Sequence, residues 1–313
     1  MHVLNAPMKS LGRRTAALTA AAAVCVGLAA APASAHSVAP AMGAKPDKAA
    51  NAQQFDYYLA LGDSLGAGYQ PNTVTGTGYL SGKGYADDIA ADLAARNRGI
   101  KYVNLACPGE TTTSMITGGC PWPEPYANQL GAATAFLAAH RRAKILVTLD
   151  IGANDIDGCT TATGIDLTCG FTGLEQTAAD VPRIMSELRR SAGRHTEFIG
   201  MTYYNPSLAA YLTGPTGQAT AHLAATFLDE FNAMLSFEFR LFGARVADVA
   251  GAFGNDAFTP LVPLFPGFDV PVNVARVCQW TWMCAPKPVG PNIHANDAGY
   301  AVMAQAFEAK IQR

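Results

Sequence analysis

Four short segments of the sequence carry a serine, a glycine, an asparagine and a histidine that could act together in catalysis. Ser64 lies in Gly-Asp-Ser-Leu-Gly-Ala-Gly, where the flanking glycines would expose its hydroxyl as a nucleophile. His294, late in the chain, could act as the general base. The main-chain N–H groups of Ser64 and Gly109 and the side-chain amide of Asn154 could hold an oxyanion. These residue types predict acyl-transfer chemistry.

Each of these residues also has an ordinary structural explanation. Serine and glycine are common in turns, as at Ser64 and Gly109, and Asn154 could only cap a helix. His294 could simply precede a helix. The four nevertheless occur in chain order, each at the expected end of a strand or the start of a helix, and this combination favours a shared catalytic role.

The elements that would position these residues alternate between strands and helices. Apolar runs predict five strands, at 57–61, 101–106, 144–150, 197–204 and 244–249. Helical spacing predicts five helices, at 85–96, 126–140, 174–192, 218–242 and 297–311. Buried strands interleaved with helices are typical of a parallel sheet covered on both faces. We therefore predict an α/β fold, a single three-layer domain with a five-stranded parallel sheet of the flavodoxin-like type, with loops at the carboxyl ends of its strands carrying the reactive groups.

The four segments, taken in order, resemble the motif blocks of the SGNH (GDSL) hydrolases. The matching residues are Gly-Asp-Ser-Leu at 62–65, the loop of Gly109, Gly-Ala-Asn-Asp at 152–155, and a late histidine followed by Asn-Asp-Ala-Gly-Tyr. The resemblance extends from about Tyr57 to the C-terminus. It is closest to exported actinobacterial lipases and esterases, which also carry three disulfides.

This resemblance implies a role for each matching residue. Ser64 is expected to be the nucleophile and His294 the general base. The oxyanion hole is expected to consist of the N–H groups of Ser64 and Gly109 and the amide of Asn154. The resemblance favours lipids or simple acyl esters as substrates and implies no cofactor.

Two positions near the histidine depart from the family pattern. Pro291 stands where the family usually has an aspartate three residues before the histidine, and Ala295 stands where proline is common. Without that aspartate a Ser-His dyad is plausible. The hydrogen bond that orients His294 is then expected to go to a main-chain carbonyl near Pro291 and not to a carboxylate.

The same serine also fits a second motif. Gly-Asp-Ser-Leu-Gly satisfies G-x-S-x-G, the nucleophile elbow of the α/β-hydrolases. That elbow normally follows several strands, whereas Ser64 follows the first strand, and the chain has no HGGG-type loop before it. Both alternatives predict an ester hydrolase.

The N-terminal residues predict export. Residues 1–35 read as a signal peptide, with a positive start, an Ala-rich apolar run and a small-residue cleavage site ending at Ala35. A membrane anchor and a twin-arginine signal at Arg13 and Arg14 are the alternatives. Residues 36–54 are rich in Ala, Pro and Lys and are expected to be a disordered leader, which leaves 55–313 as the hydrolase domain.

Six cysteines remain after the predicted cleavage. An even number in an exported chain suggests disulfides, although six cysteines allow 15 pairings. The simplest pairing joins neighbours in the sequence: Cys107 with Cys120, Cys159 with Cys169, and Cys278 with Cys284. A metal site is the alternative, but the sequence has no Cys-x-x-Cys or His-x-x-x-His pair.

Residues 251–293 have little regular pattern and are unusually apolar. Long irregular segments inside a domain are often functional, so this segment could form a wall of an acyl-chain site. It could equally be a loop that packs onto the core. The sequence leaves both possibilities open.

Composition narrows the classes of function. With 22 Lys and Arg against 24 Asp and Glu, the chain has no basic excess for nucleic-acid binding. We expect a secreted, monomeric carboxylic-ester hydrolase that acts on acyl-ester or lipid substrates, without cofactor, metal or stable membrane insertion. The alternatives are a polysaccharide O-acetyl esterase and a secreted binding protein with an inactive site.

Overall fold

The computed structural model describes residues 54–120, 126–161 and 164–312. The predicted signal peptide lies outside these residues. The predicted leader does too, except for its last residue, Gln54.

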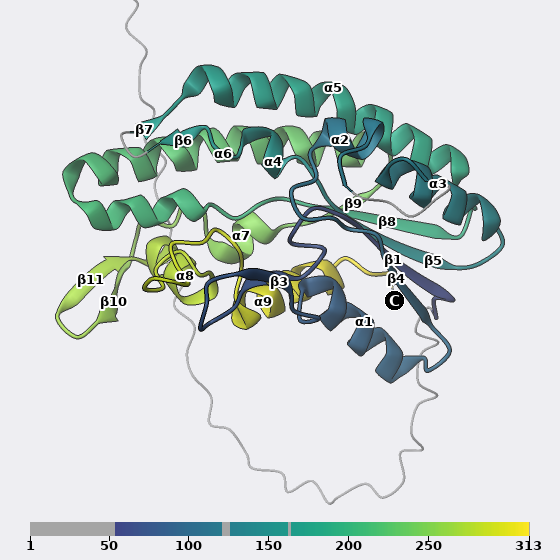
Figure 1. The fold of residues 1–313 in the computed structure, drawn as a ribbon, viewed down its shortest axis with the longest axis horizontal. Helices are drawn as coiled ribbons and strands as arrows, with labels where there is room; N and C mark the ends of the chain where they lie inside the picture. Colours follow the sequence, from purple (N-terminus) through teal and green to yellow (C-terminus); the bar gives the residue numbers. More distant parts are fainter. Residues whose placement is uncertain (1–53, 121–125, 162–163, 313) are drawn as a thin grey trace, which may run out of the picture. The chain divides into compact units, whose positions relative to one another are not determined.

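Five strands form one sheet at the centre of the described chain (Figure 1). They are β1 (Tyr57–Gly62), β4 (Lys101–Asn104), β5 (Ile145–Asp150), β8 (Thr196–Met201) and β9 (Arg245–Ala247). Their order across the sheet is β4-β1-β5-β8-β9, and each neighbouring pair is parallel. This confirms the predicted α/β fold with a five-stranded parallel sheet.

Helices cover both faces of the sheet (Figure 1). One face carries α3 (Gln129–Ala139), α5 (Leu167–Ser191) and α6 (Pro215–Leu241), and the other carries α1 (Tyr85–Arg96) and α9 (Asp297–Glu308). Every residue of β5 and β8 is buried, as the near-continuous apolar runs of these strands predict.

The long helix α5 starts earlier than the sequence predicts. Asp166 caps its N-terminus by accepting a hydrogen bond from the N–H of Cys169, so the helix begins at Leu167 and not at 174. The first turns contain two glycines and two threonines, which are weak helix formers. For this reason the sequence pattern did not predict these turns as helical.

Shorter elements lie at the ends of these strands and helices. The short helices are α2 (Thr112–Thr117), α4 (Ala153–Ile156), α7 (Val249–Phe253), α8 (Val272–Trp280) and the 3-10 helix η1 (Pro206–Thr213). The small hairpins are β2 (Tyr69–Pro71) with β3 (Gly78–Leu80), β6 (Thr160–Thr161) with β7 (Gly164–Ile165), and β10 (Leu261–Phe265) with β11 (Phe268–Pro271).

The segment 251–293 has more regular structure than its sequence pattern suggested. It contains the end of α7, the β10–β11 hairpin and α8. Its buried apolar residues form a second small core with η1 and α6, whose members include Leu208, Ala221, Val270, Val274 and Val277. Packing onto the rest of the fold therefore accounts for part of the apolar character of this segment, whereas Leu261, Phe265 and Phe268 of the hairpin are exposed.

Three disulfides close short loops of the fold. They join Cys107 to Cys120, Cys159 to Cys169 and Cys278 to Cys284, which are the pairs of sequence neighbours. Among the described residues, no helix combines the length and apolar character needed to cross a bilayer.

Candidate active site

The structure brings Ser64 and His294 into direct contact. Ser64 follows β1 and His294 lies in the loop before α9, and Ser64 Oγ is 2.9 Å from His294 Nε2. Gly62, two residues before the serine, has φ +132°, and a Cβ there would lie 2.0 Å from the main-chain oxygen of Asp150. Only glycine fits this position, so the close packing of β1 on β5 requires the first glycine of the motif.

A side chain of the same loop orients the histidine. Asn292 Oδ1 lies 2.8 Å from His294 Nδ1 and 3.0 Å from the main-chain nitrogen of His294. A main-chain N–H can only donate, so the Asn292 atom that faces it is the amide oxygen. The same oxygen accepts the Nδ1 hydrogen, which leaves Nε2 without a hydrogen and able to accept the proton of Ser64.

This contact corrects one expectation from the sequence. We expected a main-chain carbonyl near Pro291 to orient His294, and that expectation is wrong because the Asn292 side chain does so. The partner of Nδ1 is nevertheless an uncharged amide and not a carboxylate, as we expected. Burial lowers the pKa of His294 to about 4, so the imidazole is neutral at neutral pH, as a base must be.

The candidate oxyanion donors are arranged less simply. Asn154, in α4, donates a hydrogen bond from Nδ2 to the main-chain oxygen of Glu110 over 2.8 Å. An amide nitrogen carries two hydrogens, so one remains for a substrate. Gly109 has φ +83° and precedes Glu110, but it is not among the residues that line the cavity containing Ser64, Asn154 and His294.

Two buried carboxyl groups hold the turn that carries Ser64. Asp63 accepts hydrogen bonds from the N–H of Leu65 at 2.9 Å and from the hydroxyl of Tyr203 at 2.7 Å. Asp150, at the end of β5, accepts from the N–H of Gly66 at 3.0 Å. Burial raises the pKa of both carboxyls. The main-chain N–H groups of the two residues that follow Ser64 are therefore fixed by side chains.

A buried glutamine joins the first two motif loops. Gln129, at the start of α3, accepts from the N–H of Gly62 at 2.6 Å and donates to the main-chain oxygen of Gly62 at 2.9 Å. Its Nε2 also donates to Glu110 Oε2 at 2.9 Å. No sequence pattern marks this role, because Gln129 is a single glutamine at the start of a mostly apolar helix.

Beside the serine lies a mostly apolar cavity of about 120 Å³. Apolar side chains form most of its wall: Leu65, Ala153, Ile156, Ile165, Ala224, Phe227, Leu228 and Ile293. Of the segment 251–293, only Ile293 contributes. The wall of the cavity therefore comes chiefly from α4, α6, the turn of Ser64 and residues 203–207, and not from the segment 251–293.

A possible metal cluster in the described residues is not available for binding. Cys107, Glu110 and Cys120 lie close together, but the two cysteines form a disulfide and offer no thiolate ligand.

Comparisons with known proteins bear on the family and the fold of this chain. Residues 60–302 match the model of the GDSL-like lipase/acylhydrolase family. No curated protein matches the sequence. Similar solved structures include an extracellular lipase from Streptomyces rimosus, which is 19% identical with a TM-score of 0.50 over 81% of this chain and 98% of the lipase. A phospholipase A1 from Streptomyces albidoflavus is 18% identical with a TM-score of 0.47, over 82% and 99% of the two chains.

At 19% identity, the Streptomyces rimosus lipase shows no more than the fold. The family match rests on different grounds, since it covers more than half of the chain and includes Ser64, Asn154 and His294. The resemblance predicted from the motifs is confirmed, and the chain belongs to the GDSL-like lipase/acylhydrolase family.

Proposed function

We propose that the protein is an exported serine hydrolase that cleaves carboxylic esters with an apolar acyl group. One observation carries the proposal: Ser64, His294 and Asn292 are hydrogen-bonded in series, with the unprotonated Nε2 facing the serine hydroxyl. A binding protein has no need of a neutral histidine aimed at a serine in this tautomer.

The reaction follows from this geometry. Ser64 Oγ attacks the ester carbonyl carbon while its proton passes to His294 Nε2. The carbonyl oxygen becomes an oxyanion, for which the N–H of Ser64, the N–H of Gly109 and the free amide hydrogen of Asn154 are the proposed donors. His294 then gives the proton to the leaving alcohol. Water repeats the sequence on the acyl-enzyme and releases the carboxylic acid.

The cavity supports the assignment of an apolar acyl group. Its volume of about 120 Å³ and its aliphatic and aromatic wall suit a hydrocarbon chain better than a sugar ring. An acetyl group would leave most of it empty, which favours a lipase or esterase over a polysaccharide O-acetyl esterase. The proposal requires no cofactor or metal and no second copy of the chain.

Export is part of the proposal. The predicted signal peptide and three disulfides close to the motif loops both suit an oxidising compartment outside the cytoplasm.

Hydrolysis of p-nitrophenyl esters of increasing chain length tests the proposal, with acetylated xylan as the competing substrate. We expect activity on the esters, labelling by a serine-reactive phosphonate, and loss of both in Ser64→Ala. Asn154→Ala is expected to lower kcat by about 10²–10³-fold, the effect of one oxyanion donor. A folded wild-type protein that neither hydrolyses the esters nor takes up the phosphonate would overturn the proposal. Activity confined to acetylated xylan would replace the proposed substrate class.

A further inference from the structure

We infer that Gln70 is a positioning residue that holds His294 opposite Ser64, an inference that rests on the proposed function. Gln70 lies in β2, six residues after Ser64, and only 4% of it is exposed. It belongs to no motif, and its side chain does not line the cavity.

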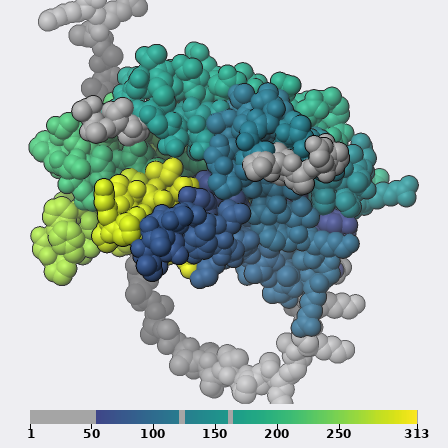
Figure 2. All heavy atoms as spheres, viewed as in Figure 1, coloured from purple at the N-terminus to yellow at the C-terminus, as the bar shows by residue number. Residues whose placement is uncertain are grey.

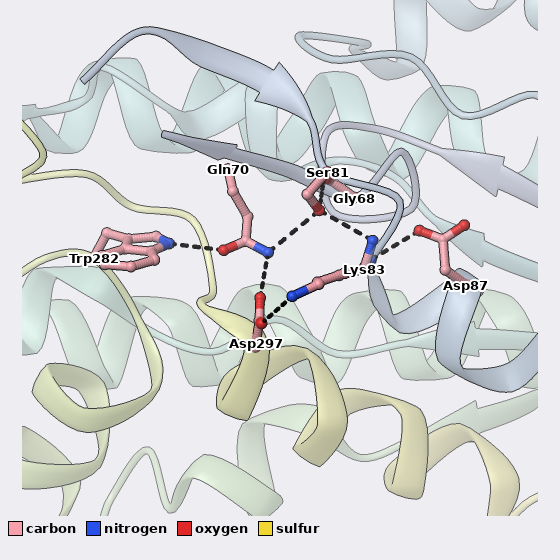
Figure 3. Close-up of polar contacts among 8 residues, drawn as sticks. Gly68, Gln70, Ser81, Lys83, Asp87, Trp282 and Asp297 are labelled. Carbon is pink, nitrogen blue, oxygen red and sulfur yellow. Dashed lines mark hydrogen bonds and ion pairs between the residues drawn. The ribbon is translucent and has the colours of Figure 1, made fainter. Parts of the chain in front are cut away.

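Every polar atom of the Gln70 side chain is hydrogen-bonded (Figure 3). Nε2 donates to Asp297 Oδ1 at 2.8 Å and to Ser81 Oγ at 3.3 Å, and Oε1 accepts from Trp282 Nε1 at 3.2 Å. A side-chain amide supplies two donors and an acceptor at once, whereas an ionised carboxylate only accepts and an aliphatic chain does neither. The partners therefore require glutamine at this position.

Two of the Gln70 partners, Trp282 and Asp297, lie before and after His294 in the sequence. Trp282 uses its main-chain nitrogen to donate to the main-chain oxygen of His294 at 3.0 Å, and its main-chain oxygen accepts from the N–H of Asn292 at 3.2 Å. Asp297 begins α9, three residues after His294. Gln70 thus holds the segment that carries both the base and the residue that orients it.

Strand β2, which carries Gln70, is also hydrogen-bonded to Ser64. Tyr69, the neighbour of Gln70, donates from its main-chain nitrogen to the oxygen of Ser64 at 3.0 Å. Its ring packs against the His294 imidazole with the ring centres 4.5 Å apart. The hydroxyl of Tyr300, in α9, donates to the main-chain oxygen of Tyr69 at 2.7 Å. The pair 69–70 therefore bridges the serine loop and the histidine loop.

The bridge joins parts of the chain that are far apart in sequence. Figure 2 shows the yellow C-terminal segment directly against the dark blue segment that follows β1, and in Figure 1 β3 lies beside α9. No disulfide joins these two segments, since the bridge Cys278–Cys284 lies entirely within the C-terminal segment. Side-chain contacts such as those of Gln70 must set their spacing, and with it the 2.9 Å between Ser64 Oγ and His294 Nε2.

The first test compares Gln70→Leu with Asn273→Leu in the same protein. Asn273 is also a buried amide, which donates to the main-chain oxygen of Asn255 at 2.9 Å outside the cavity. Both variants are expected to lower Tm. Only Gln70→Leu is expected to lower kcat, by about 10–100-fold, because displacing a reacting group by about 1 Å has effects of this size. KM should change little, and phosphonate labelling of Ser64 should slow in parallel.

A double-mutant cycle tests whether Gln70 acts through Trp282. Trp282→Phe keeps an aromatic ring but removes the N–H that Gln70 accepts, and it serves as the milder variant if Gln70→Leu does not fold. If the connection runs through this bond, the double variant should be scarcely slower than Gln70→Leu alone.

The outcomes separate this inference from the proposed function. If the wild type is active but Gln70→Leu keeps its kcat while losing as much Tm as Asn273→Leu, Gln70 is only structural and the inference is overturned. If the fold-loss of kcat in the double variant equals the product of the losses in Gln70→Leu and Trp282→Phe, then Gln70 does not act through Trp282. Absence of activity and labelling in the wild type would instead overturn the proposed function.

Discussion

Asn292 uses one oxygen to accept two hydrogen bonds from His294, from ring Nδ1 at 2.8 Å and from the main-chain nitrogen at 3.0 Å. Turning the amide over would place its NH₂ group against two other donors, so the second bond fixes the orientation needed by the first. Asn292 therefore selects the histidine tautomer, as an aspartate does in a Ser-His-Asp triad, but without adding a charge.

Removing the Asn292 amide should slow catalysis while leaving the binding of the acyl group in the cavity unchanged. We expect Asn292→Ala to lower kcat by about 10²-fold, the lower part of the range that general-base catalysis contributes, with little change in KM. The measurement is steady-state hydrolysis of p-nitrophenyl butyrate, with circular dichroism to verify the fold. Wild-type kcat in the folded variant would contradict the role given to Asn292.

Asn292→Asp is the matched variant. It keeps the acceptor and adds a negative charge beside the imidazole, which favours the protonated ring and raises the His294 pKa. We expect the variant to remain active and the acid side of its kcat/KM profile to move to higher pH than in the wild type.

The pH dependence of the wild type follows from the buried histidine. Burial lowers the His294 pKa to about 4, and the base works only when it is neutral. Activity should therefore persist at pH values where an ordinary imidazole, with a pKa of about 6.5, is mostly protonated, and it should fall as the pH approaches about 4. A kcat/KM profile that already falls by half near pH 6.5 in the folded protein would contradict this prediction.

Much of the sheet could be predicted from the sequence because burial on both faces gives its central strands near-continuous apolar runs. The runs at 144–150 and 197–204 correspond to β5 and β8, in which every residue is buried. The hairpin β10–β11 escaped prediction because Pro263 and Pro271 lie in its strands, and proline within a run argues against a strand.

The candidate site divides in the same way. Ser64, Asn154 and His294 could be recognised because each lies in a motif at the end of a predicted strand or the start of a predicted helix. Gln70 could not be recognised, because it contacts residues more than 200 positions away in the sequence. Asn292 lies only two residues before His294, but its role depends on the direction of its side chain, which no sequence pattern records.

Asp150 provides a test of the buried carboxyl pair beneath Ser64. Burial raises its pKa, and the neighbouring Asp63 carboxylate raises it further. In the unfolded chain the same group ionises near about pH 3.9, so above that pH folding takes up a proton. The free energy of unfolding should therefore fall as the pH rises towards the folded-state pKa.

Asp150→Asn removes this titration while keeping the shape of the protonated carboxyl. We expect the variant to fold, and its free energy of unfolding relative to the wild type to increase between about pH 5 and 8. Urea unfolding at several pH values measures the difference. If the two proteins depend on pH with the same slope over this range, Asp150 is ionised in the folded state and the assignment is wrong.

The cavity beside Ser64 makes a prediction about acyl-chain length. Ala224 and Leu228 line it from α6, and residues four apart lie on one face of a helix. Ala224→Leu should fill part of the cavity and lower kcat/KM for octanoyl esters by at least about tenfold while sparing acetyl esters, because one methylene in a hydrophobic pocket is worth about 10–200-fold. Leu228→Ala should enlarge it and shift the preference towards longer chains.

Leu223 provides the control on the same helix. It precedes Ala224 but is 43% exposed and does not line the cavity, so Leu223→Ala should leave the chain-length profile unchanged. The measurement is kcat/KM for a series of p-nitrophenyl esters from acetate to decanoate. Opposite shifts in Ala224→Leu and Leu228→Ala are expected because one change removes volume and the other adds it. If either variant changes kcat/KM by the same factor at every chain length, the acyl group does not enter this cavity and must bind elsewhere on the surface around Ser64.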